Sequence, residues 1–333
     1  MTVSLPPDFV LVHGPEPLPP ALKRPVIAIG NFDGVHRGHQ AVFAAARTMA
    51  AEAGGPALAL TFEPHPRTFF NPATAPFRLT PAAEKLRRIA ESGLQGAIVL
   101  DFDAALAAME AEDFVREVLV GRYGVAGVAV GFDFHFGRQR AGSPAFLKEA
   151  GERHGFAVTV VEPMRDENDA ISSTAVRRAL ASGQVGHAAH MLGRPFAVTA
   201  EVIHGDKRGR TIGFPTANLA LPQDLELAFG IYAVRAMTPA GRFDGVANYG
   251  RRPTFDNGRA LLEVHLFDFS GDLYGQSIEV EFHAYIRPEL KFDGIDALVA
   301  QIRADAQQAR EVLERDPIRL PRNPLGESPS YSK

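Results

Sequence analysis

The stretch VIAIGNFDGVHRGHQAVFAAA, residues 26–46, decides the fold of the first half of the chain. A β-branched apolar run ends at Gly30, glycines and polar residues form a turn, and an alanine-rich segment follows. This order predicts a strand, a glycine-rich turn and a helix. His36 and His39 lie three residues apart across Gly38, so we expect both imidazoles on one side of the first helical turn. Free backbone N–H groups and two imidazole donors there suit a polyphosphate.

Two other phosphate-binding patterns do not fit this turn. No GKS or GKT follows the glycines, and the dinucleotide pattern GxGxxG is absent from it. The turn instead resembles the HxGH signature of the nucleotidylyltransferase superfamily. That resemblance implies that the two histidines stabilise charge on the α-phosphate of ATP as pyrophosphate departs. The alternative is two surface histidines at a helix start, but the crowding of Gly30, Asn31, Asp33 and Gly38 in one turn favours a binding site.

Composition limits the classes of protein that fit. A chain of 333 residues exceeds the usual size of one core, which predicts two domains. A net charge of −4 argues against nucleic acid as a main partner. The absence of cysteine excludes disulfides, thiolate nucleophiles and Cys-ligated metals. The N-terminus does not read as a signal peptide, and no apolar run is long enough for a membrane span, so we expect a cytoplasmic protein.

Strand-like and helix-like segments alternate in the first half. Strands are expected at 26–30, 57–62, 96–100, 125–131 and 156–161, and helices at 37–53, 80–92, 111–122 and 143–154. This alternation predicts an α/β domain with a doubly wound parallel sheet covered on both faces. Ligands of such sheets bind beyond the carboxyl ends of the strands, where the histidine turn lies.

From about residue 195 the pattern changes. Strands are expected at 196–204, 230–238, 242–249, 260–268 and 277–285, with a helix between them only at 222–229, if at all. This pattern predicts a small closed antiparallel β-barrel. A terminal helix at 294–313 is expected to present one apolar stripe, formed by Ile295, Leu298, Val299, Ile302 and Ala306. The expected domains are 1–186 and 187–318, followed by a disordered tail at 319–333.

The segment AISSTAVRRALASG, residues 170–183, predicts a capped helix. Its hydroxyl residues Ser172, Ser173 and Thr174 are N-cap candidates, and Arg177 follows about one turn later. Hydroxyls, free amides and a guanidinium make a second anion site. The alternative is an ordinary capped helix with solvated arginines, but the histidine turn in the same sheet favours the anion site.

Aromatic side chains follow two strands of the predicted sheet. In TFEPHPRTFF, residues 61–70, His65 lies between two prolines that we expect to hold the backbone extended. Phe62 offers a surface for a planar heteroaromatic ring, the alternative being an aromatic cluster at the edge of the core. Asp133 lies in GFDFHFGRQRAG, residues 131–142, which follows a later strand. We expect this segment to border the ligand, the alternative being that it packs at the domain interface.

The densest motif of the second half is HGDKRGRTIGFPTANLAL, residues 204–221. Gly209 and Gly213 allow close backbone approach, and Thr216 and Asn218 face one way along an extended run. A hydroxyl and an amide oxygen placed so complete the shell of a hydrated magnesium ion that bridges phosphates. The alternative is a hairpin without a ligand.

Glu263 lies in the apolar strand LLEVHLFDF, on the same face as His265. A carboxylate among apolar residues is costly unless it is paired or used. Glu263 would serve as the general base for a hydroxyl that attacks a γ-phosphate. The alternative is a structural pairing with Arg251, Arg252 or Arg259.

Taken together, these motifs resemble the family of prokaryotic bifunctional riboflavin kinases and FMN adenylyltransferases, also called FAD synthetases. The likeness covers nearly the whole chain and runs through GNFDGVHRGH, TFEPHPRTFF, ISSTAVR, LGRPF, GRTIGFPTANL, GVANYGRRPTF and LEVHLFDFSGDLYG. It implies an N-terminal domain that adenylylates FMN to FAD with release of pyrophosphate. It also implies a C-terminal domain that phosphorylates riboflavin to FMN, with ATP as co-substrate and Mg²⁺ as cofactor in this chemistry.

The resemblance assigns roles to individual residues. The catalytic residues that it implies are His36, His39 and Glu263. The nucleotide site that it implies is formed by Gly30, Asn31, Gly38, Ser172, Thr174, Arg177, Gly209, Gly213, Thr216 and Asn218, of which Thr216 and Asn218 also hold the metal. The flavin site that it implies is formed by Asp33, Phe62, His65, Pro66 and Asp133.

Four residues depart from the usual family pattern. Ser143 stands where an aspartate often follows the glycine. Ala170 replaces a glycine before ISST, His135 replaces an arginine, and Tyr249 replaces a small aliphatic residue in a position where it would crowd a kinase pocket. Two other classes fit less well. A nucleotidylyltransferase for pantetheine phosphate or nicotinamide mononucleotide would not need Glu263, and a non-catalytic flavin-binding module would be expected to lack one of the catalytic side chains.

Overall fold

A computed structural model describes residues 5–166, 170–205, 209, 212–251 and 260–315 of the chain. The predicted tail at 319–333 therefore lies outside the described residues. No helix in the described ranges is long and apolar enough to cross a membrane.

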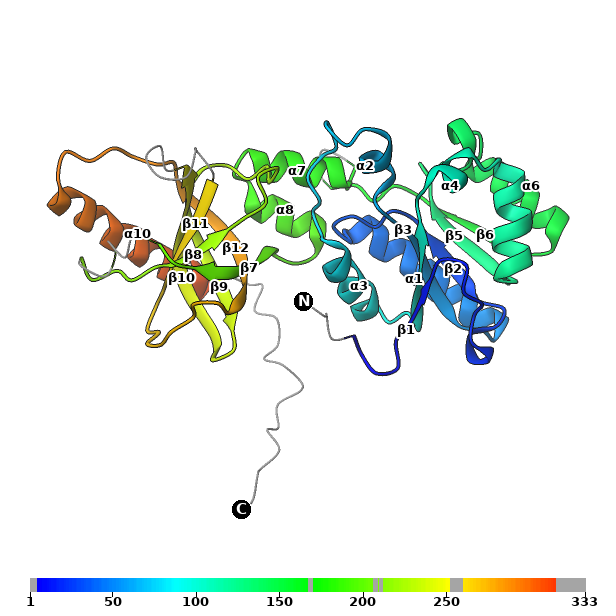
Figure 1. The fold of residues 1–333 in the computed structure, drawn as a ribbon, viewed down its shortest axis with the longest axis horizontal. Coiled ribbons are helices and arrows are strands. Elements are labelled where there is room, and N and C mark those ends of the chain that lie inside the picture. The colour runs from blue at the N-terminus through cyan, green and yellow to red at the C-terminus, as the bar shows by residue number, and fades with distance from the viewer. Residues whose placement is uncertain (1–4, 167–169, 206–208, 210–211, 252–259, 316–333) are drawn as a thin grey trace, which may run out of the picture. The chain divides into compact units, whose positions relative to one another are not determined.

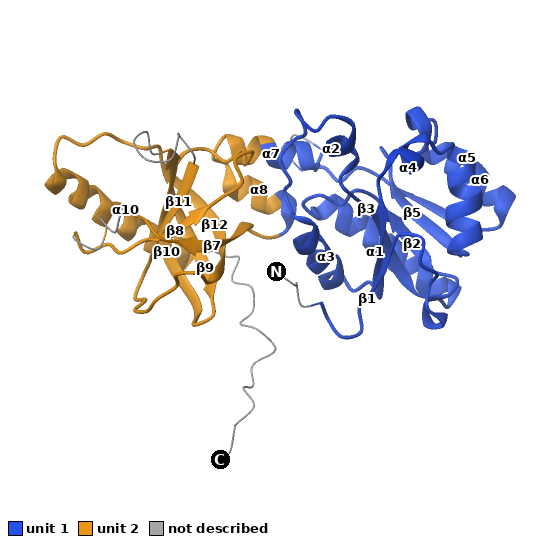
Figure 2. Ribbon diagram, in the orientation of Figure 1, with its two compact units in different colours: residues 1–177, 191–193 blue, residues 178–190, 194–333 orange. Residues whose placement is uncertain are grey.

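The chain divides into two compact units, residues 1–177 with 191–193 and residues 178–190 with 194–333 (Figure 2). The division falls inside helix α7 (Ser173–Ala181). The domain limits expected from the sequence, 1–186 and 187–318, stay a prediction.

The strands of the first unit form one sheet in which every described pair is parallel (Figure 1). They are β1 (Val10–His13), β2 (Val26–Ile29), β3 (Ala57–Glu63), β4 (Gly96–Asp101), β5 (Gly127–Gly131) and β6 (Ala157–Val161). Their order is β1-β4-β3-β2-β5-β6, which confirms the predicted parallel sheet. Strand β1 was not predicted, because its four residues VLVH are too short to show a period.

Helices cover both faces of this sheet. They are η1 (Pro20–Leu22), α1 (Arg37–Ala53), α2 (Pro66–Phe70), α3 (Ala82–Glu91), α4 (Ala104–Ala108), α5 (Ala111–Asp113), η2 (Phe114–Arg122), η3 (Arg138–Arg140) and α6 (Pro144–His154). The single helix predicted at 111–122 is a short α5 followed by η2, a π-helix.

Alternate residues of β2 enter two different cores. Ile27 and Ile29 pack with η2 and α6, whereas Val26 and Ala28 pack with α1 and α3. Because successive side chains of a strand point to opposite faces, this division shows that both faces of the sheet are covered. The doubly wound architecture is therefore confirmed, and β2 lies at its centre with the later strands on either side.

The strands of the second unit close into an antiparallel barrel in the order β10-β11-β8-β7-β12-β9. Its elements are α8 (Val185–Leu192), β7 (Phe196–Ile203), β8 (Ala217–Ala220), β9 (Gly230–Thr238), β10 (Gly241–Arg251), β11 (Ala260–Leu266), β12 (Ser277–Arg287) and α10 (Ile295–Arg315). The predicted closed barrel and terminal helix are confirmed, and the short strand β8 was missed.

The helix considered at 222–229 does not form. The backbone N–H of Ala228 donates instead to the carbonyl oxygen of Leu180 in α7, at 3.1 Å. A helical turn would need that N–H for its own chain, so this tertiary hydrogen bond competes with it.

The apolar stripe predicted for the terminal helix is wrong at its first residue. Ile295 is 61% exposed, whereas Ala309 and Leu313 are fully buried against the barrel. The other predicted stripe residues, Leu298, Val299, Ile302 and Ala306, are half-buried. Periodicity shows that a helix has an apolar side but does not show how far along its length that side is covered.

Candidate active sites

The segments that follow five strands of the first unit line one cavity of about 800 Å³. These segments leave the carboxyl ends of β2, β3, β4, β5 and β6, so the cavity lies at the carboxyl edge of the sheet. This is the edge at which open α/β sheets bind ligands, next to the strand from which the chain order departs in both directions.

The structure brings every candidate residue of the first half to this cavity. Its lining includes Gly30, Asn31, Asp33, His36, Gly38, His39, Phe62, His65, Pro66, Asp133, Ser172, Thr174 and Arg177. The positions that depart from the family pattern, His135 and Ala170, lie in the lining as well.

The two histidines are stacked at the start of α1. His36 is the N-cap, and its Nδ1 accepts a hydrogen bond from the His39 backbone N–H at 3.4 Å. The ring centroids lie 3.6 Å apart at an interplanar angle of 20°. A Cβ added at Gly38 would lie 3.1 Å from the His36 ring, so the glycine between the histidines permits the stacking.

Burial keeps His39 neutral. Desolvation lowers its pKa well below the usual value, and the nearby charges of His36 and Lys85 lower it further. Its Nδ1 is buried and has no hydrogen-bond partner among the described residues. A neutral imidazole presents one N–H donor and one acceptor, so His39 can donate to an anion without carrying a charge of its own.

Asp33 and Arg177 contact each other behind the turn. Asp33, only 2% exposed, forms an ion pair with Arg177 and accepts a hydrogen bond from the Thr80 backbone N–H at 3.0 Å. The Nε of Arg177 donates to the carbonyl oxygen of Phe77 at 2.8 Å. The resemblance assigns these two side chains to different substrates, and the contact between them was not predicted.

The ISST segment caps α7 as predicted. Of the three candidates, Ser172 makes the capping hydrogen bond: its Oγ accepts from the backbone N–H of Ala175 at 3.1 Å. Ser173 Oγ donates to the backbone carbonyl oxygen of Asp33 at 2.9 Å. The capped helix start is therefore joined to the histidine turn, and both border the same cavity.

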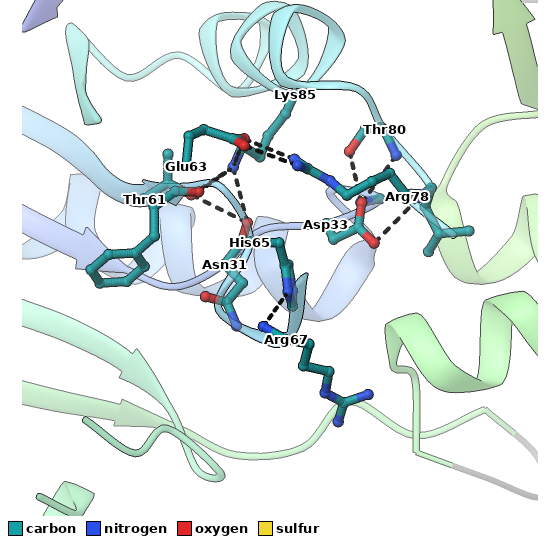
Figure 3. A network of polar contacts seen from close by, with 12 residues as sticks. Asn31, Asp33, Thr61, Glu63, His65, Arg67, Arg78, Thr80 and Lys85 are labelled. Atoms are coloured by element: carbon teal, nitrogen blue, oxygen red, sulfur yellow. Dashed lines mark hydrogen bonds and ion pairs between the residues drawn. The ribbon is translucent and has the colours of Figure 1, made fainter. Parts of the chain in front are cut away.

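A buried ionic network lies beneath the turn and was not predicted (Figure 3). Lys85, on α3, is 1% exposed, and its Nζ lies 2.6 Å from a carboxylate oxygen of Glu63. The same Nζ donates to Thr61 Oγ1 at 3.0 Å and to the carbonyl oxygen of Asn31 at 3.4 Å. Arg78 binds Glu63 through two nitrogens, at 2.8 and 2.9 Å. This network joins the end of β3, the turn after β2 and helix α3.

The expectation for the EPHP segment is wrong in part. Pro66 begins helix α2, so the backbone is not extended on both sides of His65. Proline fits the first helical position because that position needs no N–H donor. His65 caps this helix by accepting from the Arg67 backbone N–H at 3.1 Å, and burial lowers its pKa to about 4. Phe70 leaves this helix 59% exposed at the cavity.

The candidate residues of the second unit meet on the barrel. Asn218 of β8 lies directly opposite Glu263 of β11 in the strand register. Asn218 is 4% exposed, and its Oδ1 has no hydrogen-bond partner among the described residues. Gly205 lies against it, since a Cβ there would come within 2.5 Å of Asn218 Nδ2. An oxygen acceptor without a donor fits a hard cation such as Mg²⁺.

Two glycines and one of the arginines considered as partners of Glu263 lie as follows. Gly209 approaches the backbone of Phe214 and lies near Thr216, whose Oγ1 would be 3.6 Å from an added Cβ. Gly213 has a φ of +85°, which favours glycine. The guanidinium of Arg251 lies over the Phe229 ring at 5.4 Å. The other two proposed partners of Glu263, at positions 252 and 259, lie outside the described residues.

Tyr249 does not line the face that carries Glu263. It is 1% exposed, and its ring packs against that of Phe229 at 5.2 Å. Its position in β10 alternates with Asn248 and Gly250, so it points to the opposite side of the strand. The expected crowding of a kinase pocket by Tyr249 stays a prediction.

The architecture and the two sites define a class of protein, a nucleotide-dependent transferase in which an α/β unit and a β-barrel each carry a site. A family profile described as FAD synthetase matches residues 18–175, and one described as riboflavin kinase matches residues 192–313. The chain therefore belongs to the family of bifunctional riboflavin kinase/FMN adenylyltransferases.

Individual relatives agree. The bifunctional riboflavin kinase/FMN adenylyltransferase of Pseudomonas fluorescens is 43% identical over 90% of this chain and 96% of its own length. That of Escherichia coli K12 is also 43% identical, over 86% of this chain and 92% of its own. A crystal structure named Macrolide-efflux Protein, from Streptococcus pneumoniae, superposes with a TM-score of 0.81 at 32% identity and covers 91% of this chain and 99% of that one.

Proposed function

We propose specific residue roles for the two reactions of this family. The C-terminal domain phosphorylates riboflavin to FMN, and the N-terminal domain adenylylates FMN to FAD, each at the expense of ATP. Positioning and charge stabilisation dominate such phosphoryl-type transfers, so the sites need donors, a metal and one base rather than a nucleophilic side chain.

In the N-terminal cavity, an FMN phosphate oxygen attacks the α-phosphorus of ATP as the bond to pyrophosphate breaks. We assign His36 and His39 to the developing charge, because their stacked rings lie at the helix start where backbone N–H groups also converge. Gly30, Asn31 and Gly38 surround the same nucleotide, and Ser172, Thr174 and Arg177 hold its triphosphate.

The flavin of FMN is assigned to the aromatic part of the same cavity. This part carries Asp33, Phe62, His65, Pro66 and Asp133 from the sequence argument. Phe70 and Phe102, whose rings lie 5.7 Å apart in an edge-to-face arrangement, add apolar surface for a planar ring system.

On the barrel, Glu263 takes the proton of the riboflavin 5′-hydroxyl as the hydroxyl oxygen attacks the γ-phosphorus of ATP. The bond from the γ-phosphorus to the oxygen that bridges to the β-phosphate breaks, and ADP leaves. We assign Mg²⁺ to Thr216 and Asn218, where it would neutralise phosphate charge. Gly209 and Gly213 let the backbone approach the nucleotide. The unpartnered oxygen of Asn218 beside Glu263 supports this assignment.

The observation that carries the proposal is the gathering of all first-half candidates around one cavity. Because both reactions consume ATP, we place them in the cytoplasm. The test is incubation of the full chain with riboflavin and ATP, followed by chromatographic separation of riboflavin, FMN and FAD. With Mg²⁺ both products are expected, and with a chelator neither. FMN formation at an unchanged rate in the chelator would reject the metal assignment, and absence of both products with Mg²⁺ would reject the function.

A further inference from the structure

Five strands of the barrel place one residue each in a single row. Ile203 of β7 pairs with Asn218 of β8, which pairs with Glu263 of β11. Glu263 pairs with Asn248 of β10, which pairs with Ile231 of β9. Directly paired residues share a face of the sheet. Three polar side chains thus lie side by side, and an isoleucine closes the row at each end.

The opposite side of the same strands is apolar. Leu219, Leu262 and Tyr249 follow or precede the polar residues by one position, and each is at most 1% exposed. The interior of the barrel is therefore packed with the alternate residues. The three polar side chains must find their partners on the other face.

Neither asparagine side-chain oxygen of the row receives a hydrogen bond from the described residues. Asn218 Oδ1 and Asn248 Oδ1 are buried, and neither has a hydrogen-bond partner among the described residues. An unsatisfied buried acceptor costs roughly 1–3 kcal/mol. The neighbour that they share, Glu263, is a carboxylate and accepts hydrogen bonds when ionised. The described residues supply no donor to these two oxygens, and the hydroxyl of a bound alcohol could supply one.

The two oxygens lie on different sides of the base. Asn218 is on the side of Thr216, to which the metal and the phosphates are assigned. Asn248 is on the far side, two strand spacings or about 10 Å across from Asn218. Phosphate and alcohol approach each other in line during the transfer, with the base next to the alcohol. Asn248 is thus on the side from which an alcohol would reach Glu263.

We propose that Asn248 binds the alcohol substrate of the kinase reaction and determines its specificity. Its Oδ1 accepts a hydrogen bond from the ribityl hydroxyl next to the one that reacts, and this bond orients the chain toward Glu263. The inference rests on the proposed role of Glu263 as the base. Asn248 Oδ1 is shielded from solvent in the free chain. The proposal therefore requires the Asn248 side chain to rotate when the hydroxyl binds.

The experiment compares Asn248→Leu with the unaltered chain in two equilibrium assays. Riboflavin binding is followed by flavin fluorescence, and Mg²⁺–ATP binding by calorimetry. We expect Asn248→Leu to bind riboflavin about 10–100-fold more weakly, with Mg²⁺–ATP binding changed less than twofold. A 4′-deoxy analogue of riboflavin should bind the unaltered chain about as weakly as riboflavin binds the variant, and the variant should not distinguish the two flavins.

Three controls make the result specific. Asn218→Leu should show the reverse pattern, with weaker Mg²⁺–ATP binding. FAD formation from supplied FMN should be unchanged in both variants, which reports on the first unit. Urea unfolding, compared with the unaltered chain, reports whether the barrel remains folded. If Asn248→Leu does not fold, Asn248→Ser removes the amide oxygen with less disturbance and takes its place.

Two outcomes would overturn the inference. One is riboflavin binding by Asn248→Leu at the unaltered affinity, and the other is continued discrimination against the deoxy analogue. Failure of the base assignment is a separate result, because it would appear as undiminished FMN formation by Glu263→Gln whatever the binding assays give.

Discussion

Arg177 forms an ion pair with Asp33 at the wall of the N-terminal cavity, where both side chains are more than nine-tenths buried. The pair connects the start of α7 to the histidine turn, while the Nε of Arg177 also donates to Phe77 at 2.8 Å. Any role of Arg177 in binding triphosphate is therefore built on a side chain whose orientation Asp33 already fixes.

Arg177→Met is expected to destabilise the first unit. It leaves the Asp33 carboxylate buried without its cation, a change that typically costs about 3–5 kcal/mol. The free energy of unfolding in urea measures this loss. Arg116→Met is the matched control, because Arg116 is exposed and solvent screens its pairing with Asp113. Equal effects of the two changes would contradict the structural role of the pair.

Lys85→Met is expected to impair adenylylation and leave riboflavin phosphorylation intact. The change removes the ammonium that holds Glu63 at 2.6 Å and the Asn31 carbonyl oxygen at 3.4 Å, so the turn loses its support from below. We expect FAD formation from FMN to fall at least about tenfold, the equivalent of roughly 1.4 kcal/mol. The rates of both reactions, measured on the same preparation, check this. An unchanged FAD rate would show that the network does not position the turn.

Stability of the first unit should fall as the pH is lowered from about 6.5 to 4. Burial lowers the pKa of His65 to about 4, so in this range the unfolded chain binds more protons than the folded one. The pKa of His39 is lowered in the same direction. His65→Gln should make the decline shallower by on the order of 2 kcal/mol between these limits, as seen in urea unfolding at several pH values. Parallel curves for the two proteins would exclude His65 as a source of the decline.

Gly205→Ala should reduce FMN formation. The added methyl group would meet the Asn218 side chain, with Cγ at 2.7 Å, and push it from its place beside Glu263. Gly186→Ala is the control, since no atom lies within 4 Å of a Cβ there. Initial rates of riboflavin phosphorylation at saturating ATP compare the two variants. A similar loss in both, or in neither, would show that the approach of Gly205 does not matter.

Local signals made parts of the fold predictable. Helix α1 runs from Arg37 to Ala53 as expected, because His36 caps its start and Gly54 ends it with a φ of +65°. Strands β1 and β8 were not predicted from the local sequence. Their pairing depends on neighbours far away in the sequence.

Only those residues of the candidate site that belong to a recognisable motif could be predicted from the sequence. The histidine turn, the EPHP segment and the ISST segment can be recognised from their composition. The sheet topology then brings them together at the carboxyl edge of the sheet. Lys85 gave no such signal, since a lysine in the charged helix AAEKLRRIAE reads as a solvated side chain. Its burial follows from the contact with Glu63, 22 positions away in the chain, which no local pattern shows.

Separate sites in the two units are the central claim, and one measurement tests it most directly. His36→Ala and Glu263→Gln are each incubated with riboflavin, ATP and Mg²⁺, and with FMN, ATP and Mg²⁺, and the flavins are separated. We predict that His36→Ala accumulates FMN without FAD, and that Glu263→Gln converts supplied FMN to FAD but does not phosphorylate riboflavin. If either substitution abolished both reactions in a protein that remains folded, the division of labour between the units would be contradicted.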